Sequence, residues 1–114
     1  MLKLSNKKTR FFPVTVDLQN DEGRVRKFTF SAEFNVVSQS AAEDLLRVGS
    51  PEVVRDRAIC DAVFIGWKDV LDVDGETLEV NEDNRLKLLE ELGVQGAIVR
   101  AWLKSIGLEA YAKN

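Results

Sequence analysis

Residues 27–36 read KFTFSAEFNV, and they form the most regular stretch of the chain. Apolar and polar residues alternate along it. One face carries Phe28, Phe30, Ala32, Phe34 and Val36, and the other carries Lys27, Thr29, Ser31, Glu33 and Asn35. A period of two predicts a β-strand with one buried face.

A second strand is expected just before this one. Residues 12–18 alternate in the same way, and the segment 19–23 between the two has turn chemistry. Pro13 cannot donate a backbone hydrogen bond, so the first strand should lie at a sheet edge. The pair predicts an antiparallel hairpin. Because a bare hairpin is marginally stable, helices must cover its aromatic face.

Two helices are expected after the hairpin. Ser40 and Glu43 have the spacing of a capping box at the start of the first, and Gly49 ends it. Ser50 and Pro51 suit the N-cap and first position of the second. Its apolar residues recur at helical spacing until Gly66, where we expect it to end: Val54, Ala58, Ala62 and Ile65.

Two more helices are expected after a connection at residues 67–80. We expect Val73 and Leu78 to pinch that connection into a short hairpin. Asn81 is a good N-cap for the third helix, and Gly93 separates it from the fourth. The whole pattern predicts an α+β fold: an N-terminal antiparallel β-hairpin packed against about four short α-helices.

Length and composition limit what such a fold can do. The chain has 114 residues, which fits a single domain over residues 1–114, with residues 1–9 as a flexible arm. It has no histidine and one cysteine, Cys60, so a Ser-His-Asp triad, a Cys-His pair and the usual zinc sites are unavailable. We therefore expect no enzyme, no metal and no cofactor. A reducing cytoplasm and no membrane span are also expected.

Charge is unevenly distributed. Residues 1–30 have seven Lys and Arg against three acids, whereas residues 69–91 have nine acids against Arg85 and Lys87. The second region contains the predicted acidic lobe: Asp69, Asp72, Asp74, Glu76 and Glu79. Such a lobe either keeps the protein soluble or attracts a basic partner.

Two alternative uses of charged segments are disfavoured. An EF-hand alignment on Gly75 leaves Val70 and Asn81 at the positions that need anchoring carboxylates, so an acidic turn is the better interpretation of Asp72-Val73-Asp74-Gly75. Residues 7–12 mix basic and aromatic side chains, but a pI near 5.0 argues against nucleic-acid binding.

Apolar residues near the C-terminus suggest a docking strip. Trp102 should be a core residue, while Trp67 could serve either the core or an interface. We predict that a partner or second copy docks on a strip made by these residues: Trp67, Leu103, Ile106, Leu108 and Tyr111.

The order of features from Ile65 to Trp102 resembles a known family. A Gly66-Trp67 pair, an Asp74-Gly75 turn, an Asn-headed helix and a final helix follow one another. This arrangement is similar to the small tail assembly chaperones of long-tailed bacteriophages and prophages, and the resemblance extends from about Phe28 to Asn114. The basic, Phe-rich start of this chain departs from that pattern.

The resemblance implies a non-enzymatic chaperone. Its partners would be the tape measure protein, which it keeps soluble, and tail tube subunits, which it helps recruit. It would act in the bacterial host cytoplasm and be absent from the mature virion. Two hypotheses from other classes stay open: a structural virion component, such as a tail tube or head–tail joining protein, and a small enzyme.

Overall fold

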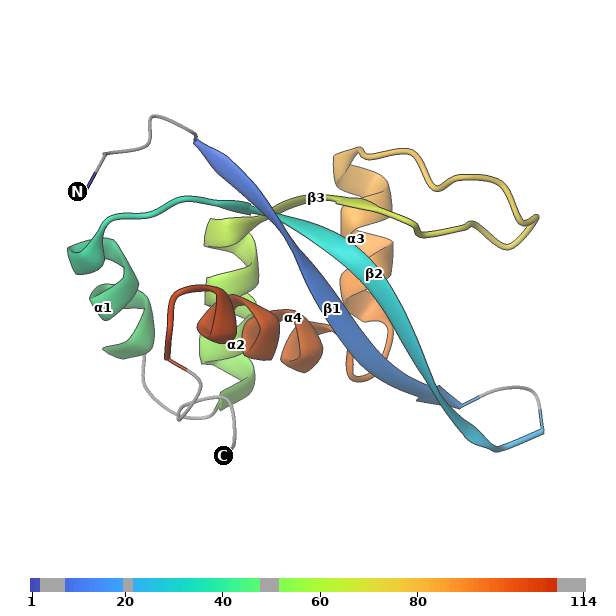
Figure 1. The fold of residues 1–114 in the computed structure, drawn as a ribbon. Coiled ribbons are helices and arrows are strands. Elements are labelled where there is room, and N and C mark those ends of the chain that lie inside the picture. Colours follow the sequence, from blue (N-terminus) through green and yellow to red (C-terminus); the bar gives the residue numbers. More distant parts are fainter. Residues whose placement is uncertain (3–7, 20–21, 48–51, 109–114) are drawn as a thin grey trace.

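Three strands and four helices make up the part of the protein that the structure describes. The computed structural model describes residues 1–2, 8–19, 22–47 and 52–108 (Figure 1). In chain order the elements are β1 (Thr9–Gln19), β2 (Val25–Asn35), α1 (Gln39–Arg47), α2 (Glu52–Val63), β3 (Phe64–Lys68), α3 (Glu82–Glu90) and α4 (Val94–Ser105). The predicted α+β class is confirmed.

The strands form one antiparallel sheet in the order β1-β2-β3. β1 and β2 are the predicted hairpin, with a register that runs from Thr9 opposite Asn35 to Gln19 opposite Val25. β1 lies at the edge, as Pro13 predicts. It begins at Thr9, and the backbone carbonyl of Lys8 already accepts the Val36 N–H at 2.9 Å. Lys8 and Thr9, which were predicted to lie in a flexible arm, therefore belong to the sheet.

The third strand is a correction to the sequence analysis. The second helix ends at Val63 rather than at Gly66, and β3 follows without a connecting residue. Aromatic and β-branched side chains favour this strand, and it pairs with β2 so that Trp67 lies opposite Ala32. Gly66 fits closely here, since an added Cβ would lie 2.9 Å from the Glu33 carboxylate.

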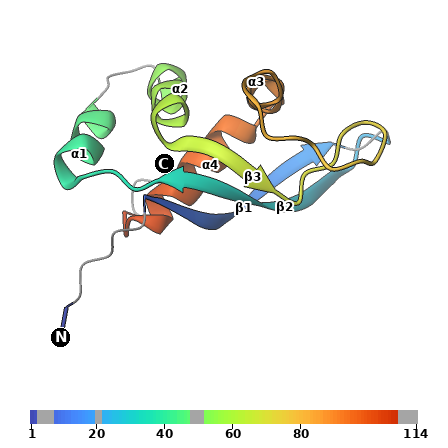
Figure 2. The same ribbon diagram turned by 90° about the horizontal axis from the view of Figure 1, so that it is seen from above.

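The helices gather on one face of the sheet, and the opposite face is open to solvent (Figure 2). α4 packs against β1, and α2 packs against α4. One hydrophobic core lies between the layers. Its largest fully buried side chains are those of Trp102, Phe64, Ile59, Ile98 and Leu103.

Burial along β2 follows the predicted alternation only in part. Phe30, Ala32 and Phe34 are buried, as their shared face requires. Phe28 and Val36 have the correct parity but remain exposed, because they lie towards or beyond the ends of the strand.

The α2–β3 junction depends on a buried arginine. A helix that passes directly into a strand leaves its last carbonyls without helical partners. Arg85, from α3, donates to the carbonyl of Cys60 at 2.7 Å and to that of Phe64 at 2.8 Å. Asn35 donates to the carbonyl of Ala62 at 3.2 Å. The Arg85 guanidinium also forms ion pairs with the carboxylates of Asp61 and Glu82, with N–O distances of 3.2 and 3.3 Å.

The face that α2 buries also differs from the prediction. Ile59, Cys60 and Val63 point into the core, while Val54 and Ala62, from the expected stripe, are exposed. The early change from helix to strand accounts for part of the error, since Ile65 is a strand residue on the outer side.

Of the predicted helix N-caps, one is confirmed and one is wrong. Asn81 caps α3 as expected, with its side-chain oxygen 2.8 Å from the Asn84 N–H. In the first helix the cap is Ser38 rather than Ser40, because the Ser38 hydroxyl accepts the Ala41 N–H at 3.2 Å. The predicted punctuation at Gly49-Ser50-Pro51 lies outside the described residues.

Candidate functional site

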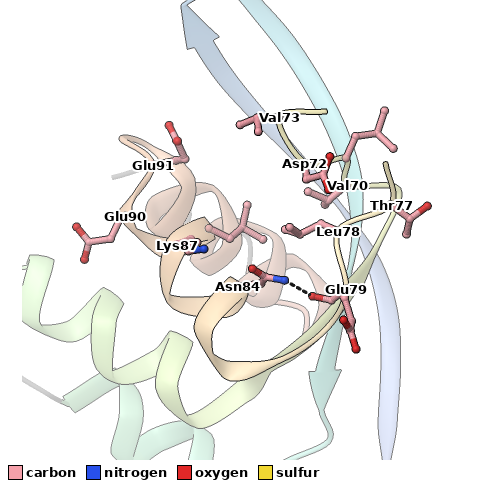
Figure 3. A pocket seen from close by; sticks show the side chains of 12 residues that line it. Val70, Asp72, Val73, Thr77, Leu78, Glu79, Asn84, Lys87, Glu90 and Glu91 are labelled. Atoms are coloured by element: carbon pink, nitrogen blue, oxygen red, sulfur yellow. Dashed lines mark hydrogen bonds between the residues drawn. The ribbon is translucent and has the colours of Figure 1, made fainter. Parts of the chain in front are cut away.

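A groove separates the loop at residues 69–80 from helix α3. We call it the acidic groove, and its volume is about 780 Å³. Figure 3 shows Val70 and Leu78 of the loop facing α3. The complete lining is Val70, Leu71, Asp72, Val73, Thr77, Leu78, Glu79, Asn84, Lys87, Leu88, Glu90 and Glu91.

The loop wall is held in shape by its own hydrogen bonds. Asp69 takes a left-handed conformation, with φ at 66°, and turns the chain out of β3. The Asp72 carboxylate accepts the backbone N–H groups of Asp74 and Glu76 at 2.9 and 3.0 Å. Such Asx bonding replaces backbone pairing in tight turns. The predicted pinch exists, but Leu71 and Thr77 form it rather than Val73 and Leu78.

Two side chains fix the loop to the body of the protein. The Trp67 indole N–H donates to the Leu78 carbonyl at 3.0 Å, which ties the loop to the core. The Asn84 amide donates to the Glu79 carbonyl at 2.9 Å, which ties it to α3 (Figure 3). The groove is therefore preformed, with walls anchored to the core and to α3.

The groove combines an apolar floor with an acidic rim. Val70, Leu78 and Leu88 form the floor and pack against the edge of the core. The lining includes four acidic residues and one lysine: Asp72, Glu79, Glu90, Glu91 and Lys87. The Glu90 side chain extends from the side of α3 away from the loop (Figure 3). An apolar floor binds an apolar ligand face, and a rim of this charge favours basic flanks and repels phosphate.

Large apolar side chains stand exposed next to the groove. Val73 is fully exposed and Leu71 is 63% exposed, and both belong to the loop wall. Single exposed apolar residues are ordinary, but two of them on one wall of a preformed groove make that wall a candidate contact surface.

The predicted docking strip does not form as expected. Trp67 and Leu103 are 5% and 1% exposed, so both are core residues. Ile106 is partly exposed, beside a pocket of about 170 Å³ that Trp102 and Arg10 also line. Leu108 is half-buried against the core, and Tyr111 lies outside the described residues.

The predicted acidic lobe is a real surface feature. Asp69, Asp74, Glu76 and Glu79 are exposed, and Asp72 is half-buried because it bonds within the loop. The sequence analysis missed that exposed apolar residues lie within this lobe. The signal was present: apolar residues at positions 71, 73 and 80 alternate with the acids.

We next consider metal-binding groups, the cysteine and membrane-spanning helices among the described residues. In residues 1–2, 8–19, 22–47 and 52–108, no group of three or more Asp, Glu and Cys side chains is placed to hold a metal ion. Burial, reinforced by the nearby Asp56 carboxylate, raises the pKa of Cys60 to about 12. That thiol is thus protonated and inert at neutral pH. No helix of the described ranges is long and apolar enough to cross a membrane.

Comparison with known proteins finds no matching family model, no matching curated protein and no matching solved structure. The acidic groove is therefore interpreted from its own geometry and charge.

Proposed function

We propose that this protein is a non-enzymatic chaperone for the assembly of a long bacteriophage or prophage tail. In this proposal it binds the tape measure protein, keeps it soluble in the host cytoplasm, helps recruit tail tube subunits, and leaves before the virion is complete. The observation that carries the proposal is the acidic groove, a preformed apolar surface with a charged rim.

The groove suits one turn or two of an amphipathic helix. An extended tape measure chain exposes apolar helical stripes before it assembles, and these stripes aggregate unless they are covered. Each large apolar side chain that moves from water into the groove contributes about 1.5–3 kcal/mol. A few such contacts give binding that is specific enough to protect the client and weak enough to be reversed.

The acidic rim supplies selectivity. Carboxylates around an apolar floor favour client segments whose apolar stripe is flanked by Lys or Arg, and they reject acidic segments. The same charge keeps the loaded complex soluble. Because exposed charges are screened by salt, client binding should weaken as ionic strength rises.

Co-expression tests the proposal. The tape measure protein of the same genome is produced with and without this chain, and its solubility and co-purification are measured. A soluble complex only in the presence of this chain supports the chaperone function. An insoluble tape measure protein in both cases, with no co-purification, contradicts it.

A matched pair of variants locates the client surface. Leu71→Ser with Val73→Ser removes two exposed apolar groups from the loop wall, whereas Val54→Ser removes an exposed apolar group of α2 that does not line the groove. We expect the loop variant to lose the client and the α2 variant to keep it. The opposite result would place the client elsewhere on the protein.

A structural virion component is the second candidate. The observation in its favour is the distal half of the β1–β2 hairpin, which extends beyond the helices as an arm (Figure 1). Arms of this kind can join subunits in rings. Mass spectrometry of purified particles separates the two candidates, since a structural component is present in them and a chaperone is absent.

A further inference from the structure

The distal hairpin exposes a second apolar surface, of opposite charge to the groove. We call it the hairpin tip surface, and its residues are Val25, Arg26, Lys27 and Phe28 of β2. Arg26 and Phe28 lie on the sheet face that the helices cover farther along, whereas Val25 and Lys27 lie on the opposite face. Phe28 and Val25 are 47% and 63% exposed, and Leu18, across from Arg26, is half-buried against the core. Asp17 stands opposite Lys27 across the hairpin, so Arg26 is the main source of positive charge among these four. An exposed phenyl ring beside a guanidinium is chemically complementary to an apolar floor with a carboxylate rim.

The two surfaces extend towards the same end of the molecule. Both views show the distal hairpin and the loop at residues 69–80 pointing away from α1, with α3 between the loop and the rest of the body (Figures 1 and 2). Surfaces at one end of a molecule can meet their counterparts on a second copy through a single two-fold axis.

We propose that two copies of this chain form a symmetric dimer in which each hairpin tip surface docks in the acidic groove of the other copy. Phe28 of one copy covers the floor formed by Val70, Leu78 and Leu88. Arg26 then approaches Glu90 and Glu91 at the end of α3. The inference does not rest on the proposed client, but the client and the second copy would compete for the same groove.

Reciprocity makes this arrangement more stable than a single contact. One tip in one groove buries a small area, whereas stable interfaces bury about 1,200–2,000 Å² in total. Two-fold symmetry repeats the same contact and doubles the buried area. It also closes the assembly, so the dimer does not extend into a filament.

The first measurement is the oligomeric state of the purified full chain. Sedimentation velocity over a concentration series, up to about 200 µM, should show a monomer–dimer equilibrium because the interface is modest. Raising the salt should shift it towards monomer, because the charged contacts are screened. A chain that is monomeric throughout this range would overturn the proposal.

Charge exchange tests the pairing itself. The tip variant is Arg26→Glu with Lys27→Gln, where Gln avoids a second carboxylate opposite Asp17. The groove variant is Glu90→Lys with Glu91→Lys, and lysine suits the C-terminal end of a helix. Each variant alone should dimerise at least tenfold more weakly than the wild type.

Mixing the two variants should restore the dimer. In the mixed dimer the acidic tip meets the basic groove, and the unchanged tip meets the unchanged groove, so both contacts are attractive again. Lys8→Gln with Arg10→Glu makes the same change in charge at the other end of β1 and should leave the dimer intact. Circular dichroism confirms that each variant is folded.

Three results would contradict the arrangement. The first is a dimer that persists in both the tip and groove variants, since another surface then joins the copies. The second is two monomeric variants that fail to associate when mixed. The third is a dimer that survives Phe28→Ser unchanged, because the ring is the main apolar group of the tip surface.

Discussion

The β1–β2 hairpin has a distal half, next to the turn between the strands, and a proximal half, farther from that turn. Both halves carry the same alternation of apolar and polar residues, but their surroundings differ. In the proximal half, Phe30 and Phe34 are 7% and 3% exposed. In the distal half, Phe28 lies on the same face and is 47% exposed. Periodicity therefore tells which face of a strand is apolar. Whether that face is covered depends on elements far away in the sequence.

The helix layer ends where the hairpin passes Gly93. This residue takes a positive φ of 90° and opens α4, and a Cβ there would come within 3.8 Å of the Asp17 carbonyl. α4 packs back along the proximal part of β1 from this point. Phe28 and Val25 are therefore left without a covering helix, whereas Val16 and Leu18 of β1 still pack against the core.

The largest difference between the halves should appear in stability. Phe34→Ala removes a buried ring and should lower the free energy of unfolding by about 3–5 kcal/mol. Phe28→Ala removes a half-exposed ring and should lower it by about 1 kcal/mol or less. Urea denaturation measured at low protein concentration, where a dimer is dissociated, tests this. Equal losses would show that the distal half is covered in the monomer.

Substitution of Arg85 should show how strongly the helix-covered part of the protein depends on buried hydrogen bonds. Arg85→Met keeps most of the packing but leaves the carbonyls of Cys60 and Phe64 without their donor. Unsatisfied buried groups cost about 1–3 kcal/mol each, so we expect a total loss of about 2–4 kcal/mol. Arg85→Lys keeps the charge but loses the fork of donors. Its free energy of unfolding should therefore lie between those of the wild type and Arg85→Met. A neutral Met variant would contradict the capping role.

Trp67 connects the covered core with the exposed loop. Trp67→Phe keeps an aromatic ring but removes the N–H that donates to the Leu78 carbonyl. We expect a loss of about 1–2 kcal/mol. The more specific readout is hydrogen exchange, which should become faster in residues 70–80 while α4 is unaffected. A uniform change across the protein would indicate a packing effect only.

The pH dependence of stability tests whether the Cys60 thiol is buried. Its pKa is raised from 9.0 to about 12, so above pH 9 the unfolded chain loses this proton while the folded protein keeps it. Stability should therefore fall between pH 9 and pH 12, by at most about 1.4 kcal/mol per pH unit from this group. Comparing the slope with that of Cys60→Ala isolates the contribution. Identical slopes would show that the thiol is accessible.

The smallest change in stability is expected for substitutions in the exposed loop at residues 69–80. Leu71→Ser with Val73→Ser should change the stability by no more than about 0.5 kcal/mol, because both side chains are in solvent. Thermal unfolding provides the measurement. A loss as large as that of Trp67→Phe would show that the loop wall packs on the body more tightly than its exposure indicates.

Local patterns explain which parts of this fold were predictable from sequence. The hairpin, the edge position of β1, the Asn81 cap and the break at Gly93 all depend on residues within a few positions of one another. The position of the acidic lobe was predictable for the same reason. These features need no knowledge of what packs against them.

Apart from two local errors, at the Ser38 cap and the Leu71–Thr77 bridge, the errors occur where distant contacts decide the structure. β3 is a strand because it pairs with β2, although Phe64-Ile65 also continues a helical apolar pattern. Arg85 was counted only in the net charge of residues 69–91, because the carbonyls it binds lie 21 and 25 residues earlier. Trp67 and Leu103 were assigned to a docking strip because nothing in their neighbourhood shows that they are covered.

The packing of α4 on β1 has a consequence for synthesis on the ribosome. The first strand to emerge is covered by the last helix described, so the hairpin's apolar face stays open while most of the chain is made. The end of α2 likewise waits for Arg85 before its carbonyls are satisfied. Translation at about 5–20 residues per second leaves these surfaces exposed for several seconds. The nascent hairpin is therefore the segment most in need of protection until synthesis has passed α4.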